Sequence, residues 1–172
     1  NGKLLQRNTL SLWGVGEKNE KVLFWDGRVD FSEDYRSQFG SNPPSTDPLV
    51  TAVHLPAVEI RETLEEDEFV HKHKIESTDS AKALYQAITA NLLEKEHDIM
   101  QLLSEETGIP LTKINFLHIA QSISSFIRDE FRLQETKLSN FVKGNVSLNK
   151  NEIEGAMIFY GKGGCSNCHS GK

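Results

Sequence analysis

The 172-residue chain has few cysteines, no excess of positive charge and no long apolar run. Its two cysteines both lie within the last eight residues, so they do not form the framework of a disulfide-rich fold, and any role they have is local chemistry. The 19 Lys and Arg residues against 25 Asp and Glu residues leave a net charge of −6, which argues against a nucleic-acid or anionic-membrane partner, since both bind basic faces. No segment approaches the roughly 20 apolar residues that cross a bilayer, so we expect no membrane span.

The first 60 residues differ in composition from the rest of the chain. They contain four of the five prolines, together with many of the glycines and aromatic residues. Because this density of glycine and proline interrupts regular elements, we predict loops and short helical turns for residues 1–60. Residues 21–25 would fit a strand, but no partner run is evident. No signal peptide is visible and the first residue is Asn1 rather than Met, so we expect a processed or cut chain.

Apolar side chains at helical spacing dominate the chain after residue 60, which predicts an all-α fold. The periodicity predicts one helix over residues 80–103, ended by Gly108 and Pro110. It predicts a second helix from Thr112 to about Phe131. The charged stretch 59–74 is expected to form a solvated face.

A third, shorter helix is predicted after Asn149. Glu152 stands three positions further on, the spacing of a capping box. We expect this helix to bury one apolar face, formed by Ile153, Ala156, Met157 and Tyr160.

The motif with the clearest chemistry is Cys165-Ser-Asn-Cys168-His169. Cys-x-x-Cys-His is the attachment signature of c-type haem, in which the two thiols bond to the haem vinyl groups and the histidine binds the iron from one side. The preceding glycines, Gly163 and Gly164, allow the backbone to turn tightly beneath a porphyrin. The sequence therefore predicts a covalent haem at this end of the chain.

Two other interpretations of the cysteine pair remain open. A thioredoxin-like redox pair expects a preceding strand in a βαβ context, whereas this chain is predicted to be helical. A zinc site would need a fourth ligand, which His71 or His73 would have to supply.

Several segments together resemble the bacterial di-haem cytochrome c peroxidases and MauG-like proteins. The sequence RNTLSL at residues 7–12 and FWDGRV at residues 24–29 are similar to a signature of that family, with Leu10 at a position where the family usually has proline. Residues 58–60, 119–130, 138–145 and 154–169 resemble further family segments in the same order. The resemblance therefore touches nearly the whole chain.

The resemblance implies two cytochrome c-like domains, each with one haem. Residues 1–60 would be the loop-rich part of the peroxidatic-haem domain and the interdomain region, and residues 61–110 the helical remainder of that domain. Residues 111–172 would begin the second domain, with its haem motif. The first haem motif is expected before Asn1 and the far ligand of the second haem after Lys172, so we expect two haems in a longer protein and an inactive piece here.

The resemblance also assigns roles to individual residues. Trp25 matches an aromatic stepping stone for electrons between the haems, and Glu59 matches the acid/base that moves a proton during O–O cleavage. Asn8 matches a calcium ligand, and Arg7 and Arg28 would pair with haem propionates. Each of these residues also has a purely structural interpretation: a core tryptophan, a helix glutamate, or ordinary ion pairs.

The implied activity is reduction of hydrogen peroxide with electrons from a small donor protein, a cytochrome or a cupredoxin. His54 precedes the assigned acid/base and is a weaker candidate for the same pocket. Alternatives are a MauG-like oxidase acting on a protein substrate, a plain electron-transfer c-type cytochrome, and a domain that has lost its haem. Covalent haem attachment takes place outside the cytoplasm, so we expect a periplasmic protein.

Overall fold

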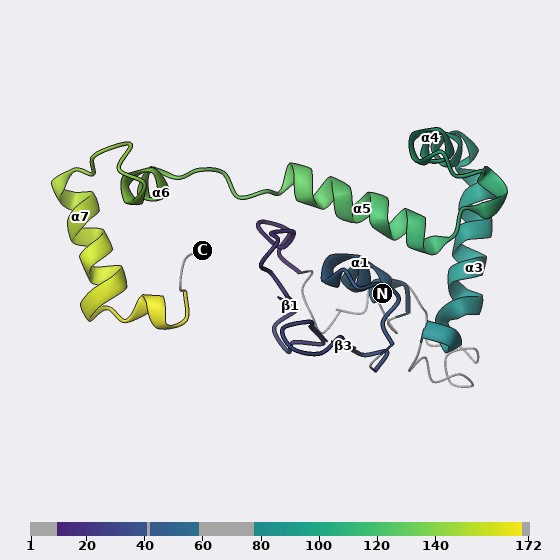
Figure 1. Cartoon of the computed structure of the whole chain (residues 1–172), viewed down its shortest axis with the longest axis horizontal. Coiled ribbons are helices and arrows are strands. Elements are labelled where there is room, and N and C mark those ends of the chain that lie inside the picture. The colour runs from purple at the N-terminus through teal and green to yellow at the C-terminus, as the bar shows by residue number, and fades with distance from the viewer. Residues whose placement is uncertain (1–9, 41, 59–77, 170–172) are drawn as a thin grey trace, which may run out of the picture. The chain divides into compact units, whose positions relative to one another are not determined.

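The computed structural model describes residues 10–40, 42–58 and 78–169, which form two compact units, residues 1–133 and residues 134–172 (Figure 1). The described residues are mostly helical, which confirms the all-α prediction at that level, while the cytochrome c-like architecture stays a prediction. Among the described residues, no helix is long and apolar enough to cross a membrane.

A small antiparallel sheet lies in the loop-rich N-terminal part. It consists of β1 (Val22–Leu23), β2 (Val29–Asp30) and β3 (Arg36–Ser37) in that order. Leu23 pairs with Val29, so the run that seemed to lack a partner in the sequence has one six residues further on. Strands of two residues are too short for an alternating pattern to reveal them, and the tight hairpin fixes their pairing instead.

The next two elements are short and buried. Helix α1 (Pro48–His54) begins at Asp47, whose carboxylate accepts hydrogen bonds from the backbone N–H groups of Leu49 and Val50. Proline in the first turn suits a helix start, because its missing N–H group would have had no helical partner. A 3₁₀ turn, η1 (Pro56–Val58), follows directly.

The single helix predicted over residues 80–103 is two helices. They are α3 (Thr78–Lys95) and α4 (His97–Thr107), separated at Glu96, whose backbone leaves the helical region at φ −122° and ψ 43°. Figure 1 shows that α4 leaves in a different direction from α3. The predicted stop is correct, since Gly108 ends α4 in the left-handed conformation.

The long amphipathic helix of the first unit, α5 (Phe116–Glu130), starts later than predicted. Asn115, rather than Thr112, is its N-cap, and it forms a capping box with His118. Thr112 lies in a 3₁₀ turn, η2 (Leu111–Lys113). In the structure this helix belongs to the first compact unit, and the domain boundary expected at residue 111 stays a prediction.

The core of the first unit forms around α1, which packs against one face of α5, the sheet and η1, while α3 packs against α5 and η1. Ala120 and Ser124 on that face are fully buried, and the Ser124 hydroxyl donates to the Ala120 carbonyl at 2.7 Å. Small side chains at these positions let α1 approach α5 closely. The larger core residues include Leu23, Val29, Phe39, Leu49, Leu55, Val58, Tyr85 and Phe116.

The second unit has helices, but none of its described residues, 134–169, is buried. It contains α6 (Lys137–Val142) and α7 (Lys150–Met157), and the predicted capping box of Asn149 and Glu152 is confirmed at the start of α7. The prediction that α7 buries its apolar face is wrong. Ile153 and Tyr160 are exposed and Met157 is 69% exposed, because no described residue of the unit covers them.

Candidate functional site

The cysteine motif sits on a tight turn that follows α7. A π turn, η3 (Ile158–Lys162), leads into it, and a 3₁₀ turn, η4 (Cys165–Asn167), carries the first cysteine. The Gly163 N–H donates to the Ile158 carbonyl at 2.8 Å, and a Cβ at Gly163 would lie 2.6 Å from that oxygen, so only glycine fits there. Gly164 has φ +65°, the left-handed region that glycine adopts without cost. The predicted role of these two glycines in a tight turn is therefore confirmed.

Backbone hydrogen bonds hold the three reactive residues on this one turn. The N–H groups of Cys168 and His169 both donate to the Cys165 carbonyl, at 3.2 and 2.9 Å. Both cysteines are free and exposed, and the His169 side chain is exposed as well. The thiol of Cys165 makes only a weak contact with the Gly163 carbonyl, at 3.7 Å. Two accessible thiols and an accessible imidazole are thus presented together.

The alternative uses of the pair gain no support from the surroundings. A helix precedes the motif, whereas a thioredoxin-like pair follows a strand. Among the described residues, no group of three or more His, Cys, Asp and Glu side chains is arranged to hold a metal ion. The two histidines considered as further zinc ligands, His71 and His73, lie outside the described residues.

The unit that carries the motif exposes several large apolar side chains. Its exposed apolar side chains are Phe141, Val142, Val146, Ile153, Met157, Ile158 and Tyr160. A groove of about 410 Å³, with Leu138, Leu148, Ala156 and Phe159 in its walls, adds to this surface. A porphyrin is a large apolar plate, so the residues present fit a haem both by their donor set and by the apolar surface around it.

Trp25 lies at the tip of the β1–β2 hairpin and is 88% exposed. The turn is closed by a hydrogen bond from the Gly27 N–H to the Phe24 carbonyl at 3.1 Å, and Phe24 has φ +66°, which is uncommon for a bulky side chain. The structural interpretation of Trp25 as a core residue therefore does not hold within the described part of the chain. Its indole is available to a partner or a cofactor.

Arg28 stabilises the same turn. Its guanidinium donates to both carboxylate oxygens of Asp26, with the shortest distance 2.8 Å, and lies 5.5 Å from the centre of the Phe24 ring. This is the structural ion pair that the sequence left open as an alternative to propionate binding.

Three further site predictions fall on residues that the structure does not describe. Asn8, assigned to calcium, and Arg7 lie before the first described residue, Leu10. Glu59 lies directly after Val58, the last described residue before the gap at residues 59–77. Val58, the residue before Glu59, is buried in the core of the first unit.

His54 is a core residue. Its side chain is 2% exposed, and its ring meets those of Tyr85 and Phe116 edge to face at 5.2 and 5.1 Å between centroids. Burial lowers the pKa of the imidazole, although the Val50 carbonyl beside it acts in the opposite direction. His54 therefore packs between helices and does not line a pocket.

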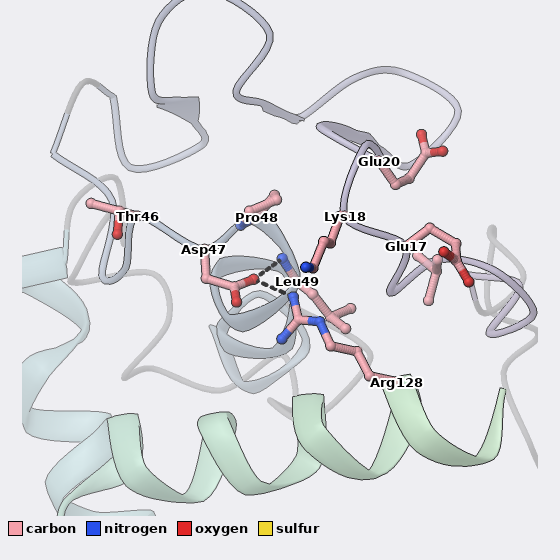
Figure 2. A pocket seen from close by; sticks show the side chains of 9 residues that line it. Glu17, Lys18, Glu20, Thr46, Asp47, Pro48, Leu49 and Arg128 are labelled. Carbon is pink, nitrogen blue, oxygen red and sulfur yellow. Dashed lines mark hydrogen bonds and ion pairs between the residues drawn. The ribbon is translucent and has the colours of Figure 1, made fainter. Parts of the chain in front are cut away.

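A polar pocket of about 370 Å³ brings together residues that the sequence did not single out (Figure 2). Arg128 of α5 donates through Nη2 to Asp47 at 2.8 Å and through Nε to the Gly16 carbonyl at 3.2 Å. Because Asp47 also caps α1, one carboxylate joins α1 to α5. The partners lie 81 residues apart, and no local pattern signals such a pair.

Substitution of Arg128 by methionine is expected to lower the free energy of unfolding of the first unit by about 1–2 kcal/mol, because the half-exposed ion pair and the bond to Gly16 are both lost. Burial alone would raise the pKa of Asp47, but the hydrogen bond and charge of Arg128, with the N–H groups of Val50 and Leu49, outweigh it and hold the pKa below its ordinary value. A carboxylate with a lowered pKa stabilises the fold above its unfolded pKa and loses that contribution as the pH falls through the folded one.

Urea unfolding of the unaltered chain and of Arg128→Met at pH 7 and at pH 3 tests this expectation. The difference between their free energies of unfolding should be smaller at pH 3. Arg132→Met is the matched control, because the ion pair of Arg132 with Asp129 is on the surface. Its loss should lower the free energy of unfolding by less than about 0.5 kcal/mol. If the two substitutions lower the free energy of unfolding equally at pH 7, the ion pair of Arg128 with Asp47 does not stabilise the first unit as expected.

Comparison with known proteins adds no relative to this description: no protein-family model, curated protein or solved structure matches the chain.

Proposed function

We propose that this chain is part of a di-haem c-type peroxidase that reduces hydrogen peroxide in the periplasm, with Cys165 and Cys168 binding one haem covalently and His169 ligating its iron. The observation that carries the proposal is the glycine-supported turn that presents two free, exposed thiols and an exposed imidazole. The haem supplies one-electron redox chemistry when bound.

The roles of the chain's own residues follow from their chemistry. The two thioether bonds would fix the orientation of the porphyrin against the turn, and His169 would fix one face of the iron. Trp25, exposed on its hairpin, would offer an aromatic ring between donor and acceptor. Glu59 would move a proton between the two oxygen atoms of the peroxide, and Asn8 would offer an oxygen ligand to calcium.

The exposed apolar side chains among the described residues of the second unit support the haem assignment. Residues 134–172 have no disulfide between their two cysteines, and none of the described residues among them is buried. A covalent haem would provide the apolar centre around which α6 and α7 can pack.

A plain electron-transfer c-type cytochrome is the second candidate. The features that favour haem all lie in residues 134–169, and a cytochrome of this kind needs neither Trp25 nor Glu59. The two functions differ in whether peroxide is turned over, and a substitution of the proposed acid/base separates them.

The covalent haem itself can be tested with this chain. We expect that chain produced in a bacterial periplasm with haem-attachment machinery keeps its Soret absorbance on the polypeptide after denaturation and extraction with acidified acetone. The Cys165→Ser and Cys168→Ser double variant should lose all of it, whereas Ser166→Ala, a change inside the motif that touches neither thiol, should keep it. Absence of covalent haem on the unaltered chain, while a known c-type cytochrome matures in the same cells, would rule the proposal out.

A further inference from the structure

The tip of the β1–β2 hairpin has an unusual backbone conformation. Phe24 has φ +66°, and among the described residues it is the only one other than glycine with a positive φ. A bulky side chain in this left-handed region is strained, and the conformation persists only where the surroundings hold it. Residues held in this way cluster at functional sites. The contacts that hold Phe24 therefore bear on the role of its neighbour, Trp25.

Trp25 depends on this turn for its position. It is 88% exposed, and in the part of the chain that the structure describes its indole makes no hydrogen bond and no ring contact. Trp13, which is also exposed, differs because its ring meets that of Phe131 edge to face at 5.4 Å between centroids. Since no neighbour holds the indole of Trp25, the backbone of residues 24–28 sets the direction in which this side chain leaves the fold.

Asp26 and Arg28 fix that backbone. The Arg28 guanidinium donates from Nε to both carboxylate oxygens of Asp26, at 3.1 and 3.2 Å, and from Nη2 to one of them at 2.8 Å. The two side chains are only 28% and 18% exposed, so water screens this pair less than an ordinary surface pair. The guanidinium also lies 5.5 Å from the centre of the Phe24 ring. One arginine side chain therefore contacts the residues on both sides of Trp25.

We propose that Asp26 and Arg28 are positioning residues for Trp25: their ion pair, with the contact between Arg28 and Phe24, keeps the hairpin in the strained turn from which the indole projects. Under the proposed function, on which this inference rests, the Trp25 ring passes one electron on and regains one, so the tryptophan is unchanged overall. Such a relay must be held at a fixed distance from donor and acceptor. A loosened turn would keep the ring but lose its position.

Backbone order parameters of the 172-residue chain test the positioning without any haem. The amides of Trp25 and Gly27 should have values of about 0.85 in the unaltered chain and below about 0.6 in Asp26→Asn and in Arg28→Gln. Lys21→Gln is the matched control, because it removes an exposed charge from the same hairpin and should leave both values unchanged. Amides of α5 should stay rigid in every variant, which reports that the first unit is folded. Rigid amides at Trp25 and Gly27 in both broken-pair variants would overturn the proposal.

Electron transfer in a longer protein with both haems tests what the positioning serves. Trp25→Phe leaves a ring that is much harder to oxidise, so oxidation of the reduced second haem by peroxide should slow. Asp26→Asn and Arg28→Gln should slow it by about tenfold, because a displacement of about 1 Å can cost about a hundredfold in rate. Arg28→Lys keeps the charge but not the two-pronged contact, and should restore part of both the rigidity and the rate. A merely structural role would not rank the variants alike in both measurements.

The two measurements distinguish failure of the positioning from failure of the proposed function. If Trp25→Phe slows the transfer but the broken-pair variants do not, although their turn is mobile, Asp26 and Arg28 are not positioning residues. If Trp25→Phe has no effect, Trp25 is not the relay and the electron route of the proposed function is wrong. In that case the order parameters alone decide whether the ion pair holds Trp25 in place.

Discussion

Covalent attachment of haem at Cys165 and Cys168 is expected to slow amide exchange across α6 and α7 by about a hundredfold or more. In the absence of a covering group, none of the described side chains in this unit is buried, and its apolar residues, such as Val142 and Met157, face outward. Covering half of the surface of three such side chains would stabilise the packed unit by about 3 kcal/mol. This corresponds to roughly two orders of magnitude in the amide exchange rate.

The measurement compares the haem-bearing chain with the Cys165→Ser and Cys168→Ser double variant. Amides of α1 and α5 serve as the internal reference, because their core is complete within the first unit and should change little. Equal protection of α6 and α7 in the two proteins would show that the unit packs without haem, and the apolar surface would then need another explanation.

Substitution of Glu59 by glutamine is expected to lower peroxide turnover by 10²- to 10⁴-fold in a longer protein that contains both haems. Glutamine keeps the size of the side chain but cannot carry a proton between the peroxide oxygens, and general acid–base catalysis typically contributes this factor. The readout is the rate of peroxide consumption with a reduced electron donor, measured over a range of pH.

Glu62→Gln, a charge change three residues away in the same acidic stretch, is the matched control and should retain turnover within about twofold. Electron transfer to the second haem should be unaffected in both variants. If Glu59→Gln turns over peroxide as fast as the control, Glu59 is not the acid/base. If the unaltered protein transfers electrons but consumes no peroxide, it is an electron-transfer cytochrome.

Several predictions that depend only on neighbouring residues were correct. The capping box of Asn149 and Glu152, the stop at Gly108 and the glycine turn before Cys165 are all set by a handful of neighbouring residues. Each has a backbone requirement that the residue type reveals directly.

Several errors arose where a distant residue, or the lack of a covering group, decides the outcome. A periodic apolar stripe identified the exposed face of α7, but periodicity does not say what covers a face, so the predicted burial of Met157 was wrong. The break at Glu96 interrupts a stripe that continues on both sides. The link between Asp47 and Arg128 spans 81 residues and has no counterpart in local sequence.

The exposed cysteine turn of the second unit also implies an order of assembly. Enzymes that attach haem must reach both thiols, and a motif buried early in folding would be closed to them. Here backbone hydrogen bonds shape the cysteine turn, and none of the described side chains of α6 and α7 is buried. Under the proposed function, maturation would precede packing: the chain would present a pre-shaped substrate loop, and the modification itself would start the collapse of this unit.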